Sequence, residues 1–216
     1  MSNLIFSGLN WIRKDGAGRG PGPNNWLPAN ATLDDSGNVV LKITTDPQGN
    51  WYCAEISTVL PLGFGTFSFN LNGAIDTLDP NVVLGMFCYG NTDSFNEIDI
   101  EVARFDSTKN LYFSVYPDTN SPTKQYQSKA FAFSLPDGTY SQHQFDWNAN
   151  RIVFSSDYGH PSINKGRMAT WTVPIDTSFT VPQTPLYLHI NLWLRGGQPP
   201  TNGQTVQVII NSITHP

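Results

Sequence analysis

Residues 97–102, with the sequence EIDIEV, alternate strictly between acidic and apolar side chains. A period of two residues indicates a β-strand rather than a helix. Successive side chains of a strand point to opposite faces of a sheet, so Glu97, Asp99 and Glu101 share one face and the isoleucines and valine share the other. We therefore expect the apolar face to enter a core and the opposite face to carry three neighbouring carboxyls.

The chemistry of such a face is acidic and crowded. Like charges in a row destabilise a strand unless something compensates, and they shift pKa values apart, as acid–base catalysis requires. Glu97 and Glu101 are about 13 Å apart at the backbone, and side chains leaning together bring their carboxyls within about 5–6 Å. This distance suits a retaining glycosidase (~5–5.5 Å) better than an inverting one (~6.5–9.5 Å). The spacing alone leaves open a solvated strand face or a ladder of calcium ligands.

The length of 216 residues predicts one domain, residues 1–216, because all-β sandwiches of this size are commonly undivided. Charged residues make up only 13%, while glycine, proline and aromatic residues are plentiful, which favours a β-rich protein with many turns. Short strand-like stretches are separated by turn residues, and no segment has a helical period. The pattern predicts an all-β antiparallel sandwich of the jelly-roll kind. Further strands are expected at residues 38–44, 51–58, 63–69, 81–89, 111–116, 129–134, 141–147, 151–156, 168–173, 186–194 and 205–213.

The chain before residue 27 gives a weaker pattern. Residues 14–20, with the sequence KDGAGRG, are expected to be flexible, and residues 21–26 to form a turn-rich loop that ends on an aromatic residue. Cys53 and Cys88 are the only cysteines, and their spacing leaves open one disulfide or two buried thiols.

The segment Glu97-Ile98-Asp99-Ile100-Glu101 resembles the E-x-D-x-E signature of glycoside hydrolase family 16, the retaining β-glucanases that include lichenases, laminarinases and xyloglucan-active enzymes. Other motifs of that family are matched in the same order along the chain, by Cys53-Ala54-Glu55, Gly63-Phe64-Gly65, His143–Trp147 and Asn191-Leu192-Trp193. The resemblance implies a concanavalin A-like jelly roll with a carbohydrate-binding cleft on its concave face. It also implies endo-acting hydrolysis of a β-1,3-1,4-glucan, or of a β-1,3-glucan, by double displacement.

Carried over by residue, the resemblance implies that Glu97 is the nucleophile, that Glu101 is the general acid/base and that Asp99 tunes both. It also implies sugar contacts for Glu55 and Asn191. Aromatic side chains suit sugar rings because they offer a flat apolar surface with a polar edge. The expected substrate-binding residues are therefore Glu55, Asn191, Trp193, Tyr89, Tyr116, Phe95, Asn25 and Trp26.

The chain also departs from the lichenase pattern at sugar-contacting positions. Asn96 stands where an Asp is common, Tyr112 and Ser114 replace a Gln and an Asn, and Ser57 replaces an Arg. The departures therefore bear on the preferred linkage, while the acids that carry the mechanism keep the family pattern. A transglycosylase acting on β-glucan or xyloglucan, and a non-catalytic glycan-binding module, remain alternatives.

The charge, hydropathy and histidine spacing of the chain limit its expected partners, cofactors and location. With a net charge of −5 and no basic run, the chain is expected to bind a neutral β-glucan polysaccharide and not nucleic acid. No apolar run approaches the ~18 residues of a membrane span. The first residues lack the organisation of a signal peptide, so either the protein acts inside the cell or a leader has been removed. Because an enzyme that attacks a polymer favours the second alternative, we expect a secreted protein, with an intracellular location left open. The protein is expected to be a monomer. The four histidines show no metal-like spacing, and His189 is expected to serve in the core or in support of the site. No cofactor is expected to be required, and a structural calcium ion is left open.

Overall fold

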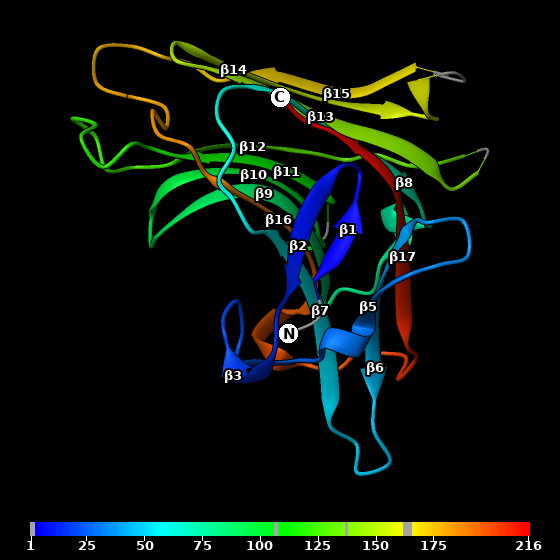
Figure 1. Cartoon of the computed structure of the whole chain (residues 1–216). Helices are drawn as coiled ribbons and strands as arrows, with labels where there is room; N and C mark the ends of the chain where they lie inside the picture. Colours follow the sequence, from blue (N-terminus) through cyan, green and yellow to red (C-terminus); the bar gives the residue numbers. More distant parts are fainter. Residues whose placement is uncertain (1–2, 106–107, 137, 162–165) are drawn as a thin grey trace.

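The computed structural model describes residues 3–105, 108–136, 138–161 and 166–216, and these residues form two antiparallel β-layers (Figure 1). Hydrogen bonding orders the first layer as β1-β2-β7-β16-β9-β10-β11-β12. Its strands are β1 (Leu4–Phe6), β2 (Leu9–Arg13), β7 (Trp51–Thr58), β16 (Tyr187–Leu194), β9 (Val82–Thr92), β10 (Phe95–Val102), β11 (Leu111–Tyr116) and β12 (Gln127–Phe131).

The second layer has the order β15-β14-β13-β8-β17-β6-β5. Its strands are β15 (Gly166–Thr172), β14 (Arg151–Tyr158), β13 (Tyr140–Asn148), β8 (Gly65–Asn72), β17 (Val206–Thr214), β6 (Val39–Thr45) and β5 (Ala31–Leu33). Short 3-10 turns occur at Pro28–Asn30, Ile75–Thr77 and Arg195–Gly197. The predicted fold class, an antiparallel β-sandwich, is confirmed. None of the described helices is long and apolar enough to cross a membrane.

The strand that carries the acids is β10, and its apolar face enters the core as predicted. Ile98, Ile100 and Val102 are fully buried. In the register of the sheet they lie beside equally buried residues of β9 and β16, namely Cys88, Met86, Leu84, Leu188, Ile190 and Leu192. Each buried aliphatic side chain stabilises the fold by roughly 1.5–3 kcal/mol relative to exposure. This burial fixes the register and thereby holds the acidic face outward.

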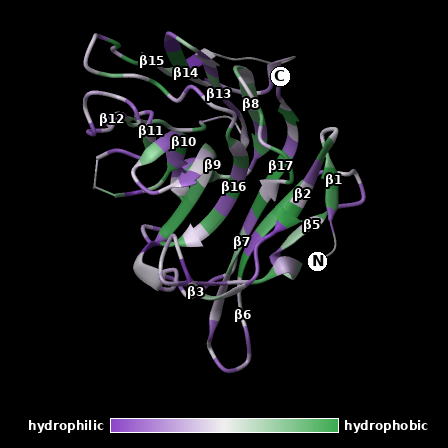
Figure 2. Cartoon of the chain, turned by 60° about the vertical axis from the view of Figure 1, so that its left-hand side comes forward, coloured by the Kyte–Doolittle hydropathy of each residue, from purple (hydrophilic) through white to green (hydrophobic). Residues whose placement is uncertain are grey.

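Aromatic side chains join the two layers. The ring of Phe113 on β11 stacks on that of Phe154 on β14, with centroids 4.9 Å apart. Phe154 also stacks on Trp171 of the same layer at 5.6 Å. Hydrophobic residues follow strands such as β7, β9 and β16, while hydrophilic colours predominate in the connections (Figure 2). Both cysteines are free and buried, which decides the alternative left open by their spacing.

The N-terminal region is more ordered than its sequence predicts. The stretch expected to be flexible contains β3 (Gly16–Arg19), which pairs with β4 (Asn24–Trp26). The indole of Trp26 donates a hydrogen bond to the carbonyl oxygen of Arg19 at 3.1 Å, and the ammonium of Lys14 lies 4.2 Å from the indole centroid. Local composition hides these strands because their order comes from contacts with Trp26 and from the pairing of β4 with β7.

Candidate active site

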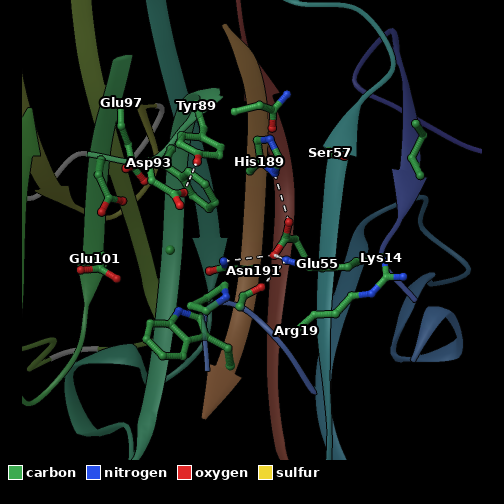
Figure 3. Close-up of a pocket in the computed structure, with 18 of the residues that line it drawn as sticks. Lys14, Arg19, Glu55, Ser57, Tyr89, Asp93, Glu97, Glu101, His189 and Asn191 are labelled. Atoms are coloured by element: carbon green, nitrogen blue, oxygen red, sulfur yellow. Dashed lines mark hydrogen bonds and ion pairs between the residues drawn. The ribbon is translucent and has the colours of Figure 1, made fainter. Parts of the chain in front are cut away.

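A cleft of about 910 Å³ lies on the face of the first layer that points away from the core. Its floor is formed by β10, β9, β16, β7 and β2, and residues 14–21 form one wall. Figure 3 shows the acids of β10 on one side of this cleft and Glu55, Lys14 and Arg19 on the other. The cleft therefore collects polar groups from segments that are far apart in the sequence.

Strand register explains how these groups come together. One cross-strand row runs from Asp99 through Phe87 and His189 to Ser57. The neighbouring row runs from Glu101 through Gly85 and Asn191 to Glu55. Residues directly opposite one another in an antiparallel pair share a face, so every side chain in these rows points toward the cleft.

Gly85 leaves room in the second row. A Cβ atom at this position would lie only 2.5 Å from Oδ1 of Asn191, which therefore points over the glycine toward the Glu101 strand. No hydrogen-bond partner for this Oδ1, or for Oδ1 of Asp99, occurs among the described residues. The glycine thus makes room for the amide of Asn191, whose oxygen lies over it without a partner and can meet a polar ligand group.

The three carboxyls hold protons more tightly than exposed acids. Burial raises the pKa of Glu97 to about 7, with smaller contributions from the charges of Glu101 and Asp93. Burial also raises the pKa of Glu101 to about 7, and burial together with both glutamates raises that of Asp99 well above its usual value. The cluster as a whole therefore retains protons near neutral pH, as a general acid requires.

Glu55 sits at the opposite end of the second row and is held by three neighbours. Its Oε2 accepts hydrogen bonds from the ammonium of Lys14 at 2.8 Å and from the amide of Asn191 at 3.4 Å. Its Oε1 lies 3.1 Å from Nδ1 of His189. Burial raises the pKa of Glu55, but the hydrogen bond to His189 and the charge of Lys14 more than offset it and leave the pKa below its usual value. Glu55 is therefore an ionised anchor that orients Asn191 and His189.

The sequence matches the family Glycosyl hydrolases family 16 over residues 24–210. The protein belongs to glycosyl hydrolases family 16. This finding confirms the resemblance predicted from the acidic strand, and its match extends over most of both β-layers.

Related sequences include two bacterial β-glucanases. The β-glucanase of Bacillus licheniformis is 28% identical over 200 residues, covering 90% of this chain and 73% of the relative. That of Bacillus subtilis strain 168 is 27% identical over 197 residues, covering 87% and 72%.

Solved structures share the family 16 fold. The Bacillus licheniformis β-glucanase aligns with a TM-score of 0.69 at 24% identity, covering 95% of this chain and 91% of the other. A prokaryotic β-1,3-1,4-glucanase (lichenase) derived from a mouse hindgut metagenome aligns with a TM-score of 0.67 at 24% identity, covering 95% and 92%. These alignments show the same overall fold over nearly the whole chain.

The cleft of this family 16 protein contains seven of the residues expected from sequence. They are Glu97, Asp99, Glu101, Glu55, Asn191, Trp193 and Tyr89. The hydroxyl of Tyr89 donates a hydrogen bond to Oδ1 of Asp93 at 2.8 Å, which ties the β9–β10 turn to the cleft floor. Their individual roles in sugar binding or catalysis remain predictions.

The structure does not bring the other four predicted residues to the lining of the cleft. Trp26 is only 2% exposed and lies beneath Lys14. The amide of Asn25 donates instead to the carbonyl oxygen of Trp51 at 3.2 Å. Phe95 precedes a register shift, and the backbone at Asn96 has a φ of 51° there, so the alternation that places Glu97 in the cleft does not extend to Phe95.

Tyr116 lies outside the cleft for a different reason. Tyr116 is on β11, the strand next to β10 on the side away from β9, and it lies opposite Glu97 in the register of the two strands. Its ring stacks on that of Tyr126, with the centroids 4.9 Å apart. Its position on the acidic face is nevertheless evident from its pKa, which burial and the nearby charges of Glu97 and Asp99 raise. Tyr116 thus belongs to the same face of the sheet as the carboxyls.

Sequence reasoning missed several residues that line the cleft. Lys14 and Arg19 come from the stretch expected to be flexible, and Asp93 from the turn before β10. Phe87 and Gly85 belong to a strand predicted correctly, yet nothing in its apolar sequence distinguishes the cleft-facing residues from the core-facing ones. The register of Phe87 and Gly85 with the acids would have identified them, because it places them opposite Asp99 and Glu101.

Proposed function

We propose that the protein is an endo-acting retaining β-glucanase that hydrolyses β-1,3-1,4-glucan, with β-1,3-glucan as the second candidate polymer. The observation that carries this proposal is the row of three carboxyls with raised pKa values, Asp99 buried and Glu97 and Glu101 half-buried, on one strand face in the cleft of a family 16 chain. The names of the related sequences, β-glucanases, support the substrate class.

In the first step we assign attack on the anomeric carbon to the ionised carboxylate of Glu97. A C–O bond forms between Glu97 and the sugar while the glycosidic bond breaks, and Glu101 gives its proton to the departing oxygen. In the second step Glu101, now a carboxylate, takes a proton from water, and the water oxygen displaces Glu97. Asp99 lies between the two glutamates in sequence and on the same face, and the charges of Glu101 and Glu97 add to the effect of burial in raising its pKa.

Partners and location are proposed with the activity. We infer a secreted monomer that acts on a neutral polysaccharide and binds neither nucleic acid nor membrane. The names of the related Bacillus β-glucanases support the polysaccharide partner, and the net charge of −5 argues against nucleic acid. No group of three or more His, Cys, Asp or Glu that could hold a metal ion occurs among the described residues. We propose that no cofactor is required, which is tested by measuring activity before and after dialysis against a chelator and after adding calcium.

The test compares the unmodified protein with Glu97→Gln on barley β-glucan, lichenan, laminarin and xyloglucan. Reducing ends are followed with time, and NMR of the first product identifies its anomeric form. We expect release from β-1,3-1,4-glucan by the unmodified protein only, with the β-anomer formed first. Product of inverted configuration would contradict the retaining mechanism, and binding without turnover in the unmodified protein would favour a glycan-binding module.

A transferase would be recognised in the same assay. Adding an oligosaccharide acceptor would then give longer products in place of new reducing ends, because the glycosyl-enzyme would be intercepted by a sugar hydroxyl instead of water.

A further inference from the structure

The acidic face of the first layer does not end at β10. In the register of β10 and β11, Tyr116 lies opposite Glu97, Ser114 opposite Asp99 and Tyr112 opposite Glu101. Ser128 of β12 lies opposite Ser114 and continues the row that begins at Asp99. All of these side chains share the face of the carboxyls, on the side of β10 away from the cleft that contains Glu55.

Two tyrosines dominate this outer part of the face. The ring of Tyr126 stacks on that of Tyr116 with centroids 4.9 Å apart and an interplanar angle of 20°. Tyr126 is 54% exposed, which is high for so large an apolar side chain. One of its faces packs on Tyr116, and much of the rest of the ring is open to solvent. Beside this pair, Ser114 and Ser128 contribute only small side chains.

The segment that carries Tyr126 is tied to the rest of the protein. Its backbone amides at Asp118 and Thr123 donate to the carbonyl oxygens of Thr180 and Ser178 at 2.9 Å and 2.8 Å. The amide of Thr180 in turn donates to the hydroxyl of Ser121 at 2.9 Å, and Ser121 is almost fully buried.

Lys124 also connects the segment that carries Tyr126 to the acidic strand β10. The ammonium of Lys124 lies 5.1 Å from the ring centroid of Phe95, the first residue of β10, and donates to the carbonyl oxygen of Thr119 at 2.6 Å. The position of Tyr126 relative to the acids is therefore set before any ligand arrives.

From these observations we infer that Tyr126, supported by Tyr116, is a stacking platform for the sugar units of the leaving-group side of the glucan. This inference rests on the proposed function. Sugar rings present apolar C–H faces that pack on an exposed aromatic ring, and a tyrosine keeps its hydroxyl at the wet edge. The occupant is a neutral β-linked glucosyl unit, on the opposite side of the scissile bond from the unit held in the cleft.

The surface on the Glu55 side of β10 and the surface on its β11 side differ, and each suits one part of the substrate: the glycosyl unit that becomes attached to Glu97, or the leaving group. The glycosyl unit that becomes covalently attached must stay bound through the second step, and the cleft offers it a set of polar groups held in place by Glu55. The leaving group must depart after the first step. A platform of two aromatic rings and small serines binds it by stacking and releases it readily.

The test uses Tyr126→Ala, with Tyr140→Ala as a matched control. Tyr140 is also exposed, at 43%, but it lies on β13 in the second layer. Two substrates are compared: a β-1,3-1,4-gluco-oligosaccharide that extends across the acids, and an aryl glycoside that has no sugar on the leaving-group side. We expect Tyr126→Ala to lower kcat/KM on the oligosaccharide by about fivefold, to leave the aryl glycoside unchanged, and to be rescued by Tyr126→Phe.

Other outcomes separate the two proposals. If Tyr126→Ala matches the unmodified protein on the oligosaccharide, or loses equally on both substrates, the platform assignment is wrong while the glucanase assignment stands. If the unmodified protein neither turns over nor binds either substrate, the glucanase assignment is overturned, and the platform with it. Thermal denaturation of each variant verifies that it is folded.

Discussion

Glu55 on β7 and His189 on β16 are separated by 134 residues of chain, yet Oε1 of the glutamate lies 3.1 Å from Nδ1 of the histidine. The same carboxylate accepts a hydrogen bond from Lys14 of the N-terminal segment. One buried anion thus joins three distant segments at one end of the cleft. Because a buried charge without its partners is costly, this anchor makes the cleft geometry sensitive to single substitutions.

Glu55→Gln is expected to lower the free energy of unfolding by about 1–3 kcal/mol, because it leaves Lys14 without its anionic partner and gives His189 a weaker acceptor. Urea denaturation at neutral pH measures the loss. The control is Lys14→Met, alone and combined with Glu55→Gln. The double variant is expected to lose less than the sum of the single losses, since the pair interacts directly. Additive losses would show that the ion pair is energetically negligible.

A methyl group at Gly85 is expected to displace the amide of Asn191 from its place over the glycine. The added Cβ atom would meet Oδ1 of Asn191 at 2.5 Å, so the amide must move. We expect Gly85→Ala to lower kcat/KM at least about tenfold, since misplaced groups near reacting atoms cost about this much or more. Gly63→Ala is the control, because a Cβ atom there meets nothing within 4 Å. Equal activity of both variants would place the substrate away from Gly85.

Glu101, the proposed general acid/base, is expected to reduce stability at alkaline pH. The folded-state pKa of Glu101 is raised to about 7 by burial, so the folded protein binds more protons than the unfolded chain between about pH 4.5 and 7. Stability from this group is therefore present at low pH and lost as pH rises through 7. Glu101→Gln removes this loss of stability and is expected to stabilise the protein by about 3 kcal/mol at pH 8, since the window of about 2.5 pH units contributes 1.36 kcal/mol for each unit.

Thermal denaturation at pH 8 and at pH 4.5 checks this prediction. The stabilisation is expected at pH 8 and should vanish at pH 4.5, where the glutamate of the unmodified protein is largely protonated in the folded state. A stabilisation that is equal at both pH values would show that improved packing, and not charge, is responsible. The variant is expected to be inactive on β-glucan at either pH.

The sequence predicts this site well wherever the signal is alternation within one strand. The apolar residues of 97–102 fix which face of β10 is buried, so the acids were placed correctly on the opposite face. The Asn191–Trp193 motif likewise marks a cleft strand. Phe95 was misplaced because the positive φ at Asn96 interrupts the alternation, and a turn conformation of this kind leaves no periodic trace.

Contacts between distant segments explain the remaining differences. Trp26 was expected in the cleft because exposed aromatic rings bind sugars, but Lys14 covers its ring. Lys14 is positioned by Glu55, which lies 41 residues further along the chain. Neither local composition nor spacing encodes this three-residue arrangement. Likewise the pairing of Tyr126 with Tyr116 depends on how residues 117–126 fold back over β11, and the sequence shows only two separate tyrosines.

Asp93 is expected to set the acidic limb of the pH–activity profile. Its charge contributes to the raised pKa of Glu97, after burial and the charge of Glu101. The proposed nucleophile works only when ionised, so removing this charge should let Glu97 ionise at lower pH. We expect Asp93→Asn to move the acidic limb of kcat/KM to lower pH and to leave the alkaline limb, governed by loss of the proton from Glu101, in place. Because Asp93 is exposed, high salt should reduce the difference between variant and unmodified protein. A shift of the alkaline limb instead would reverse the assignment of the two glutamates.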